Sequence, residues 1–224
     1  EKFFPKCNAI MIPIADGGEG TVDTFIYSLK AEKVSLKVKN AFGEISEVYY
    51  GRIKNKAIIE VAQVVGLTKA EGRENPSITS TYGVGEIINH AVENGCNEIF
   101  IGLGGSSTND SGVGAAAALG TVFKDKNGKE FIPVGKNLNE VEYIDISKTL
   151  DKLKNCKVTA MCDIDNPMYG KNGAAFVFAP QKGAEKNMVK MLDNNLRILS
   201  EKIKKNLNKD VSKIKGSGAA GAFG

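Results

Sequence analysis

The sequence predicts an α/β protein built on a mixed sheet. Three short apolar runs, near 9–14, 98–103 and 157–162, each lead into a polar loop that carries an acidic residue, and a helix or turn follows. Continuous apolar strands flanked by helices are typical of parallel or mixed sheets that are covered on both faces. A fourth region, 34–62, alternates apolar and polar residues, which indicates an antiparallel hairpin or meander within the same architecture.

The helices and turns between these strands follow from apolar spacing and from turn residues. The first strand is followed by a loop at 15–20 and a helix near 21–30. Turn signals at 42–44 and 54–56 divide the alternating region. Further helices are expected near 83–94, 111–119 and 185–207, the last with apolar residues at helical spacing.

Composition excludes several classes of function. The 224 residues carry a net charge of +4, and lysines that lie beside glutamates predict solvated helix faces rather than a nucleic-acid surface. No apolar run approaches the roughly 20 residues that span a bilayer. The four cysteines lack CxxC spacing, so we expect the reduced thiols of a cytoplasmic protein. The chain begins without Met and ends in a glycine-rich stretch, so we expect it to be part of a longer protein.

Acidic side chains follow three of the predicted strands. In an open α/β sheet, ligands bind beyond the carboxyl ends of the strands. If these strands share one sheet and one direction, the acids Asp16, Glu19, Asp110 and Asp163 converge there. Carboxylates beside a phosphate site can hold Mg²⁺, which takes oxygen ligands from one or two acids and from the substrate phosphates. A glycine turn with an acidic first helical turn is an equally open interpretation of the loop at 15–20.

The loop after the second strand combines glycines with short polar side chains. Close backbone approach and side-chain donors are offered by Gly104, Gly105, Ser106, Ser107, Thr108 and Asn109. The helix expected from about Ser111 directs its free N–H groups at this loop, which predicts an anion cradle and favours phosphate. The alternative is that Asp110 or Ser111 merely caps the helix. The loop lacks the P-loop pattern, and the GxGxxG at 216–221 follows no convincing strand.

Two further features point to phosphoryl transfer. An apolar stretch at 174–179, interpreted as a strand, places Gln181 and Lys182 after it, where a lysine can reach a phosphate; a solvated turn lysine is the alternative. His90 is the only histidine, and an exposed pair with Glu86 at helical spacing is expected for it. A Ser-His-Asp hydrolase or a zinc site with several histidines is therefore not expected. Carboxylates, a phosphate-binding loop and Mg²⁺ together favour phosphoryl transfer.

Four segments resemble one known family. They are PIADGGEGT (13–21), GLGGSSTNDSGVGAAAALG (102–120), CDIDNPMYGKNGAAFVFAPQKGA (162–184) and GSGAAGAFG (216–224). In consistent order over essentially the whole chain, they are similar to the bacterial glycerate kinases of the type I family. The resemblance implies ATP-dependent phosphorylation of D-glycerate to a phosphoglycerate, usually 2-phosphoglycerate in the bacterial members of this type, and leaves open which hydroxyl is phosphorylated here.

The resemblance also implies two α/β domains with the active site in the cleft between them. Residues 1–32 would be a partial strand–helix unit of a flavodoxin-like parallel α/β domain, and residues 33–224 a mixed α/β domain that carries the Gly/Ser-rich loop. Members of this family begin with a further strand and continue well past the end of this sequence. We therefore expect the chain as given to bind poorly or not to turn over.

The motifs and the resemblance together assign roles to individual residues. Asp163 is expected to accept the proton of the glycerate hydroxyl, and Lys182 to support the phosphate. Metal binding is expected from Asp110 and Glu19, with Asp16 as an alternative ligand. Phosphate and nucleotide binding is expected from Gly104, Gly105, Ser106, Ser107, Thr108 and Asn109. Glycerate binding is expected from Arg73, Asp16, Gly17, Gly18 and Asn166, although Arg73 is equally interpreted as a surface turn residue.

The expected cofactors are ATP and Mg²⁺, and the expected partners are the small molecules D-glycerate and ATP, without nucleic acid or membrane. Homo-oligomerisation is left open. Two other functions stay in view. One is a non-catalytic module that binds phosphate or another anion. The other is a magnesium-dependent phosphatase with an aspartyl nucleophile, because 163–165 has DxD spacing, although the partners that such an enzyme requires are not evident.

Overall fold

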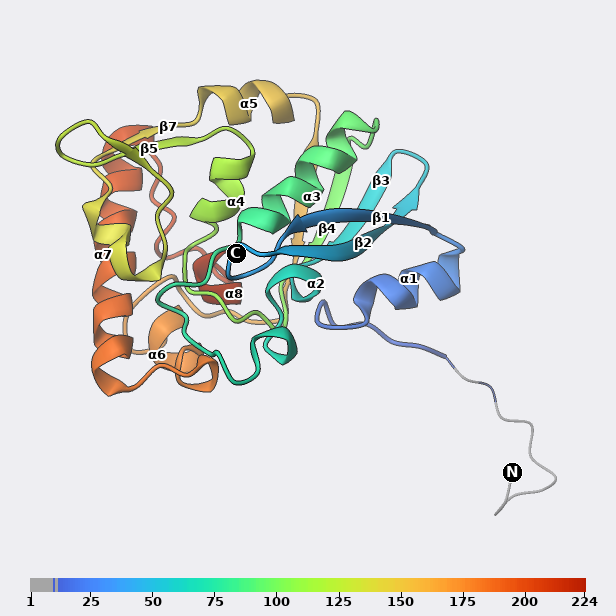
Figure 1. Ribbon diagram of the computed structural model, residues 1–224, viewed down its shortest axis with the longest axis horizontal. Helices are drawn as coiled ribbons and strands as arrows, with labels where there is room; N and C mark the ends of the chain where they lie inside the picture. The colour runs from blue at the N-terminus through green and yellow to red at the C-terminus, as the bar shows by residue number, and fades with distance from the viewer. Residues whose placement is uncertain (1–9, 11) are drawn as a thin grey trace, which may run out of the picture.

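The computed structural model describes residues 10 and 12–224, and its centre is a five-stranded mixed sheet (Figure 1). Its strands lie in the order β1-β2-β3-β4-β8. They are β1 (Glu32–Lys39), β2 (Ile45–Ile53), β3 (Lys56–Glu60), β4 (Glu98–Gly102) and β8 (Lys157–Met161). The first three pair antiparallel, whereas β3, β4 and β8 run parallel. The predicted mixed α/β architecture is confirmed.

The antiparallel half of the sheet forms from the alternating region of the sequence. Asn40 turns the chain between β1 and β2, because its side-chain oxygen accepts hydrogen bonds from the N–H groups of Phe42 and Glu44 at 2.9 and 3.1 Å. Asn favours turns through such bonds to nearby backbone. Between β2 and β3, Lys54 adopts a positive φ of 56°. The turns predicted near these positions are confirmed.

The parallel half of the sheet brings three strand ends to one edge. In the register of the sheet, Glu60 at the end of β3 lies opposite Gly102 of β4, which in turn lies opposite Met161 of β8. The loops after β4 and β8, both of which carry acids, therefore start side by side. The prediction that the strands near 98–103 and 157–162 share one sheet and one direction is confirmed.

Helices cover both faces of this sheet (Figure 1). Successive strand residues point to opposite faces, and two neighbours in β2 illustrate this. The Tyr49 hydroxyl donates to Asp23 of α1 (Thr21–Leu29) at 2.9 Å. The ring of Tyr50 packs edge-on against His90 of α3 (Tyr82–Glu93), with centroids 5.9 Å apart. The remaining helices near the sheet are the short α2 (Ala62–Val65) and α4 (Val113–Ala118).

A second layer, built from a small antiparallel sheet and a long helix, lies beside the main sheet (Figure 1). Its strands, in the order β6-β5-β7, are β5 (Val122–Lys124), β6 (Glu130–Phe131) and β7 (Tyr143–Asp145). The long helix α7 (Lys186–Leu207) buries an apolar face and confirms the helix predicted at 185–207. The other elements are α5 (Ser147–Leu153), α6 (Ala174–Phe178), α8 (Ala219–Ala222) and 3-10 turns at Thr68–Ala70, Gly135–Glu140 and Pro180–Lys182.

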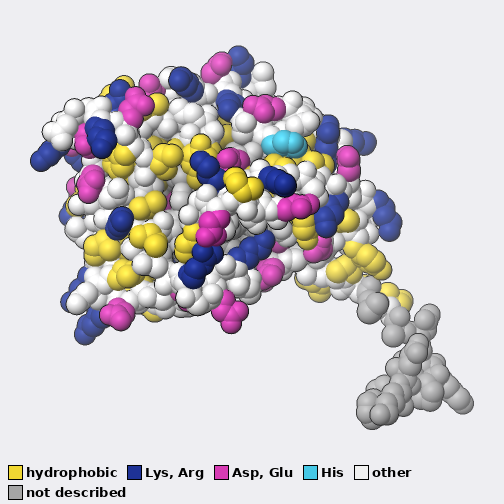
Figure 2. Space-filling model, in the orientation of Figure 1, with side chains coloured by type: hydrophobic (Ala, Val, Ile, Leu, Met, Phe, Trp, Pro, Cys, Tyr) yellow, Lys and Arg dark blue, Asp and Glu magenta, His cyan; other side chains and the backbone are white. Residues whose placement is uncertain are grey.

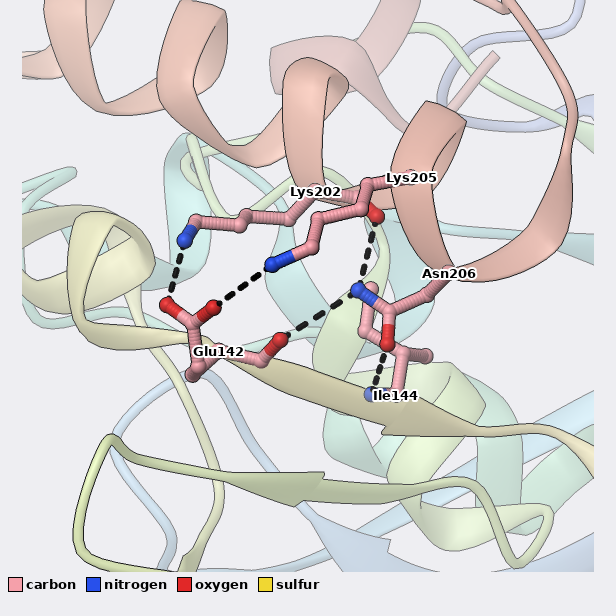
Figure 3. Close-up of polar contacts among 5 residues, drawn as sticks. All are labelled: Glu142, Ile144, Lys202, Lys205 and Asn206. Carbon is pink, nitrogen blue, oxygen red and sulfur yellow. Dashed lines mark hydrogen bonds and ion pairs between the residues drawn. The ribbon is translucent and has the colours of Figure 1, made fainter.

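Polar contacts fasten α7 to β7 (Figure 3). The carboxylate of Glu142, just before β7, pairs with Lys202 and with Lys205, the latter at 3.1 Å. One turn along, the Asn206 side chain accepts from the backbone N–H of Ile144 and donates to the backbone oxygen of Glu142, both at 3.3 Å. The helix therefore supplies side-chain hydrogen-bond partners for backbone groups at and just before β7 in the small sheet.

The buried apolar residues form two clusters, one per layer. The first lies between the main sheet and α3, and the second lies against α7. The helix α4 contributes to both, with Ala115 in the first cluster and Val113 in the second. Gly85 of α3 allows α4 to approach closely, since a Cβ there would lie 2.3 Å from the backbone oxygen of Ala115.

Three sequence expectations differ from the structure. The strand near 9–14 lies partly outside the described residues, and its described part has no regular structure because no neighbouring strand pairs with it. The apolar run at 174–179 is the helix α6 rather than a strand; a single helical turn and a short buried strand are hard to distinguish by length. His90 lies 3.3 Å from the Tyr50 hydroxyl, whereas Glu86 accepts from the Lys39 N–H, so the expected pair of the two is wrong.

On the face shown in Figure 2, basic and acidic side chains are interspersed rather than gathered by sign. Within the described part of the chain, every helix is too short or too polar to cross a membrane.

Candidate active site

A cavity of about 130 Å³ lies at the carboxyl ends of β4 and β8. Five segments far apart in the sequence form its walls: the loop before α1, the loop after β4, the loop after β8, the end of α6 with the 3-10 turn that follows it, and the start of α8. Its lining residues are Asp16, Leu103, Gly104, Gly105, Ser106, Cys162, Asp163, Ile164, Phe178, Gln181, Lys182, Ala219 and Ala220. This is the edge of the sheet at which α/β proteins bind their ligands.

The first two of these loops pack backbone against backbone. The N–H of Gly104 donates to the oxygen of Gly17 at 3.0 Å. A Cβ on Gly102 would lie 2.4 Å from that same oxygen, and a Cβ on Gly104 would lie 2.7 Å from the Cα of Gly18. The glycines of both motifs are therefore required by the contact between the loops. This contact brings the Asp16 side chain to the cavity.

Two carboxylates face the cavity from different loops. Asp16 precedes the glycine contact, and its Oδ1 accepts the Gly18 N–H at 2.8 Å, which leaves its other oxygen free of protein partners in the described structure. Asp163 follows β8 after one intervening residue. Both side chains are exposed and line the cavity. Exposed carboxylate oxygens can accept a proton from a ligand or can coordinate a hard cation.

Lys182 supplies the positive charge of the cavity. Its side chain is only 2% exposed, and its Nζ donates to the Ser106 hydroxyl at 2.9 Å and to the backbone oxygen of Thr108 at 2.7 Å. An ammonium group has three N–H donors, so one remains for a ligand. Burial lowers the pKa of Lys182 to about 7, an effect that the nearby negative charge of Asp110 partly opposes. A bound anion would favour the charged form further.

Two backbone amides complete this side of the cavity. Gly105 and Ser106 both line it, and in the described part of the chain their N–H groups have no acceptor. The peptide that carries the Ser106 N–H is held by neighbouring backbone, because the N–H of Leu67 donates to the Gly105 oxygen at 2.9 Å. Amides fixed in this way are suitable donors to an anion. The lining of the cavity therefore combines two carboxylates with an ammonium group and two open amide donors.

Asp110 lies outside the cavity and is fully buried. One carboxylate oxygen accepts from the N–H and the hydroxyl of Thr81 at the start of α3, both at 2.8 Å, and the other accepts from the Gly112 N–H at 3.3 Å. Burial raises the pKa of Asp110, and the bonds from Thr81 oppose this. The carboxylate therefore accepts N–H groups from the residues that precede α3 and α4, which is closer to the helix-capping alternative than to a metal ligand. Its metal-ligand role stays a prediction that this geometry does not favour.

The start of α4 also differs from the expected anion cradle. The helix begins at Val113 rather than near Ser111, after Ser111 and Gly112 with φ of 56° and 68°. The Asp110 carboxylate already accepts N–H groups at this end. The open amide donors therefore belong to the loop, at Gly105 and Ser106, and not to the helix.

The other predicted phosphate residues lie behind the cavity wall. The Ser107 hydroxyl donates to the backbone oxygen of Val65 at 2.8 Å, and Thr108 offers its backbone oxygen to Lys182. The Thr108 hydroxyl and both polar side-chain atoms of Asn109 are buried without a partner among the described residues. Ser107, Thr108 and Asn109 are thus part of the support beneath Ser106, and their direct contact with a ligand stays a prediction.

Three further predicted residues lie outside the cavity lining. Arg73 is half-exposed, pairs with Glu44 at 2.8 Å and covers the ring of Phe42. Glu19 is exposed and accepts from the Thr68 hydroxyl at 3.4 Å. Asn166 donates its side-chain amide to the backbone oxygen of Asn172 at 2.8 Å. The surface-turn interpretation describes Arg73 in this structure.

Sequence reasoning missed the apolar wall of the cavity. This wall is formed by Leu103, Ile164, Phe178, Ala219 and Ala220. These residues lie in segments whose polar residues suggest a function, and no periodic pattern in the sequence indicates that the apolar ones are neighbours. It also missed Glu60, which is 1% exposed at the end of β3. A lone acid at the end of the run Ala57–Ile59 is a signal that could have drawn attention to it.

The fold and the cavity together define an α/β protein with a ligand site at the ends of parallel strands, lined by both carboxylates and hydrogen-bond donors. A model described as the "Glycerate kinase family" matches residues 1–224. The chain belongs to the glycerate kinase family, and the resemblance drawn from the motifs is confirmed at this level.

Curated relatives and a solved structure agree with this family. The glycerate kinase of Bacillus cereus is 44% identical over 99% of this chain and 59% of its own length. The glycerate 2-kinase of Escherichia coli is 42% identical over 100% of this chain and 59% of its own length. A crystal structure of a protein from Salmonella typhimurium LT2, assigned as glycerate kinase 2, has a TM-score of 0.90 and 37% identity, over 100% of this chain and 60% of its own. The chain thus spans about three fifths of the relatives' length.

Proposed function

We propose that the full-length protein transfers the γ-phosphoryl group of ATP to D-glycerate and forms 2-phosphoglycerate. The observation that carries the proposal is one cavity whose lining combines the carboxylates of Asp16 and Asp163 with Lys182 and the amides of Gly105 and Ser106. Phosphoryl transfer depends mainly on positioning and on neutralising the charge of the phosphate oxygens. The family and the names of its curated members support the identity of the substrate.

In this proposal the hydrogen-bond donors and the carboxylates of the cavity have separate roles. The third N–H of Lys182 and the amides of Gly105 and Ser106 bind the oxygens of the transferred group. Asp163, at the end of β8, accepts the proton of the attacking glycerate hydroxyl. Arg73 lies outside the lining. Within this cavity the donors available to the glycerate carboxylate are therefore Lys182 and the amides of Gly105 and Ser106.

The carboxylates that line the cavity, Asp16 and Asp163, fit Mg²⁺. This ion is commonly bound by one or two carboxylates together with substrate phosphates and water. Asp16 has one carboxylate oxygen free of protein partners, and groups of three or more metal-binding side chains are absent from the described residues. A site of this kind depends on the nucleotide for its remaining ligands. When bound, Mg²⁺ would neutralise charge on the phosphate oxygens, and Asp16 is the residue that we propose to hold it.

The size of the cavity bears on which substrate enters it. At about 130 Å³ it is smaller than the roughly 300 Å³ at which sites for drug-sized ligands begin. A three-carbon acid or a phosphoryl group fits such a space, whereas a whole nucleotide does not. We propose that the reacting groups meet in this cavity and that the adenosine lies outside it.

The domain division stays part of the proposal. We propose that residues 1–32 complete a flavodoxin-like domain in the longer protein and that residues 33–224 form the second domain. In the structure α1 packs on the main sheet, where a Cβ on Gly51 of β2 would lie 3.6 Å from Val22. The helix therefore contacts the second domain as well as belonging to the first.

The experiment that tests the proposal measures ADP release from D-glycerate, ATP and Mg²⁺ by the full-length protein, with the 224-residue chain alongside. Identification of the product by phosphorus NMR distinguishes 2-phosphoglycerate from its isomer. Turnover by the full-length protein supports the kinase. Binding of ATP or glycerate without turnover would favour an anion-binding module, and phosphate release from phosphoglycerate without ADP formation would favour a phosphatase.

Asp163→Asn tests the proposed base. We expect kcat to fall by about 100-fold or more, because general-base catalysis contributes at least that much. Asp165→Asn is the matched control: Asp165 is exposed, pairs with Lys215 at 3.1 Å and lies outside the cavity lining. Activity of Asp163→Asn equal to that of the control would show that another group accepts the proton.

A further inference from the structure

Glu60 is a buried carboxylate that the proposed reaction does not use. It is the last residue of β3, its side chain is 1% exposed, and it lies outside the cavity lining. Burial of a carboxylate costs free energy unless hydrogen bonds compensate. The residues that supply those bonds therefore indicate what Glu60 does.

The partners of Glu60 lie at the start of α1. Its Oε1 accepts the Gly20 N–H at 3.3 Å, and its Oε2 accepts the Val22 N–H at 2.9 Å; Gln63 adds a side-chain bond at 3.2 Å. Gly20 is the N-cap residue of α1, with a φ of 89°, and has no side chain with which to cap the helix. The first N–H groups of a helix need partners from elsewhere. Glu60 supplies them from the main sheet.

The same loop is held at its other end. The Gly17 N–H donates to the Thr21 hydroxyl at 3.1 Å, and the Gly17 oxygen accepts from Gly104. Asp16 is the next residue back and reaches the cavity from this position. The 16–20 loop therefore spans two anchors, the glycine contact with the loop after β4 and the Glu60 carboxylate at the end of β3.

We propose that Glu60 is a positioning residue, which holds the 16–20 loop so that Asp16 presents its free oxygen to the cavity. This inference rests on the proposed function, in which Asp16 holds Mg²⁺. The carboxylate also occupies the positive end of the α1 dipole. The N–H groups at the start of α1 are therefore taken up by Glu60, whereas Gly105, Ser106 and Lys182 line the cavity with open donors.

The test compares Glu60→Ala and Glu60→Gln with Ile59→Ala in the full-length protein. Ile59 is the neighbouring strand residue; it is fully buried in the cluster between the sheet and α3, so its truncation destabilises the protein without touching the 16–20 loop. Loss of positioning lowers rate steeply, and we expect kcat of Glu60→Ala to fall about 10- to 100-fold. The Mg²⁺ concentration for half-maximal activity should rise. Glu60→Gln should recover part of both, because its amide oxygen still accepts a hydrogen bond.

Amide hydrogen exchange gives a readout that does not depend on activity. Exchange over residues 16–24 should become faster in Glu60→Ala and stay at the wild-type rate in Ile59→Ala. The proposal is overturned if Glu60→Ala matches Ile59→Ala in kcat, in Mg²⁺ dependence and in exchange over this segment. If Glu60→Ala does not fold, Glu60→Gln is the deciding variant. A wild-type kcat together with wild-type exchange over residues 16–24 in Glu60→Gln would also overturn the proposal. An inactive wild type would contradict the proposed function, while the exchange measurement would still test the hold of Glu60 on the loop.

Discussion

Lys182 is the residue whose surroundings predict a measurable pH dependence of stability. Its pKa is about 7 in the folded protein, against 10.5 for an ordinary lysine, because burial disfavours the charge. Between these two values the unfolded chain holds a proton that the folded protein lacks. The free energy of unfolding therefore rises with pH in this window, by up to about 1.4 kcal/mol per pH unit, and the slope disappears below pH 7.

Urea unfolding of the wild type and of Lys182→Met at several pH values measures this effect. The difference between the two isolates Lys182 from the other titrating groups, and it should grow in favour of the wild type as pH rises above about 7. Lys215→Met is the control, since the Lys215 side chain is 81% exposed and its removal should leave the slope unchanged. A parallel pH dependence in the wild type and Lys182→Met would show that this lysine stays charged in the folded protein.

At the scale of elements, the contact between the two glycine loops predicts an intolerance to side chains. Gly102→Ala would place a Cβ 2.4 Å from the Gly17 oxygen, so the loops must separate. We expect the free energy of unfolding to fall by about 1–3 kcal/mol, the usual range for overpacking. Gly51→Ala is the matched strand control, because its Cβ meets its neighbours at 3.6 Å or more, and it should change stability by less than about 1 kcal/mol. Thermal unfolding compares the two, and equal effects would contradict the close contact.

The attachment of α7 to β7 gives a second prediction at this scale (Figure 3). Asn206→Ala removes the bonds to Ile144 and Glu142, and we expect a loss of about 1–2 kcal/mol of stability because backbone groups at the sheet edge lose their partners. Glu142→Gln should cost less, and its effect should fade at high salt, because its ion pair with Lys205 is exposed and that with Lys202 is partly exposed. Urea unfolding at low and high salt measures both. A larger effect for Glu142→Gln would show that charge, rather than the amide bridge, holds the helix.

At the scale of the whole molecule, the two apolar clusters should unfold together. They share α4, which places Val113 in one cluster and Ala115 in the other. An element common to two cores couples their stability, and such a structure unfolds in one cooperative transition. Exchange protection of amides in α3 and in α7, measured against urea, reports on each layer separately. Coincident midpoints are expected, and two separate midpoints would show that α4 does not couple the layers.

The sequence indicated the sheet and the positions of the site loops because these depend on local patterns. Strands 98–102 and 157–161 are short apolar runs with acids after them, so Asp163 could be placed at a strand end, and it lines the cavity as expected. Asp110 is also an aspartate in a loop that follows a strand, yet its side chain is buried and accepts a hydrogen bond from Thr81. No local pattern distinguishes an acid that faces solvent from one that caps a distant helix.

Contacts between distant segments account for the other differences. The family resemblance favours Arg73 as a ligand of the glycerate carboxylate, but its guanidinium pairs with Glu44 in the turn between β1 and β2. The strand expected near 9–14 requires a neighbour to pair with, and in the described part of the chain none does so. Glu60 and the apolar wall become visible only when the fold brings separate loops together. Pairing between residues far apart in the sequence is the information that one sequence does not display.

The unequal construction of the cavity walls has a consequence for substrate range. On one side, glycine backbones touch with no side chains between them, so substitutions there disturb two loops at once. Elsewhere in the lining, Ile164 and Phe178 contribute apolar side chains to the wall. Substitutions that admit a longer or branched hydroxy acid should therefore be tolerated at Ile164 and Phe178, while the glycines of the contact between the two loops should stay unchanged. Under the proposed function, a library confined to these two positions would be the direct test of whether the substrate range can be widened.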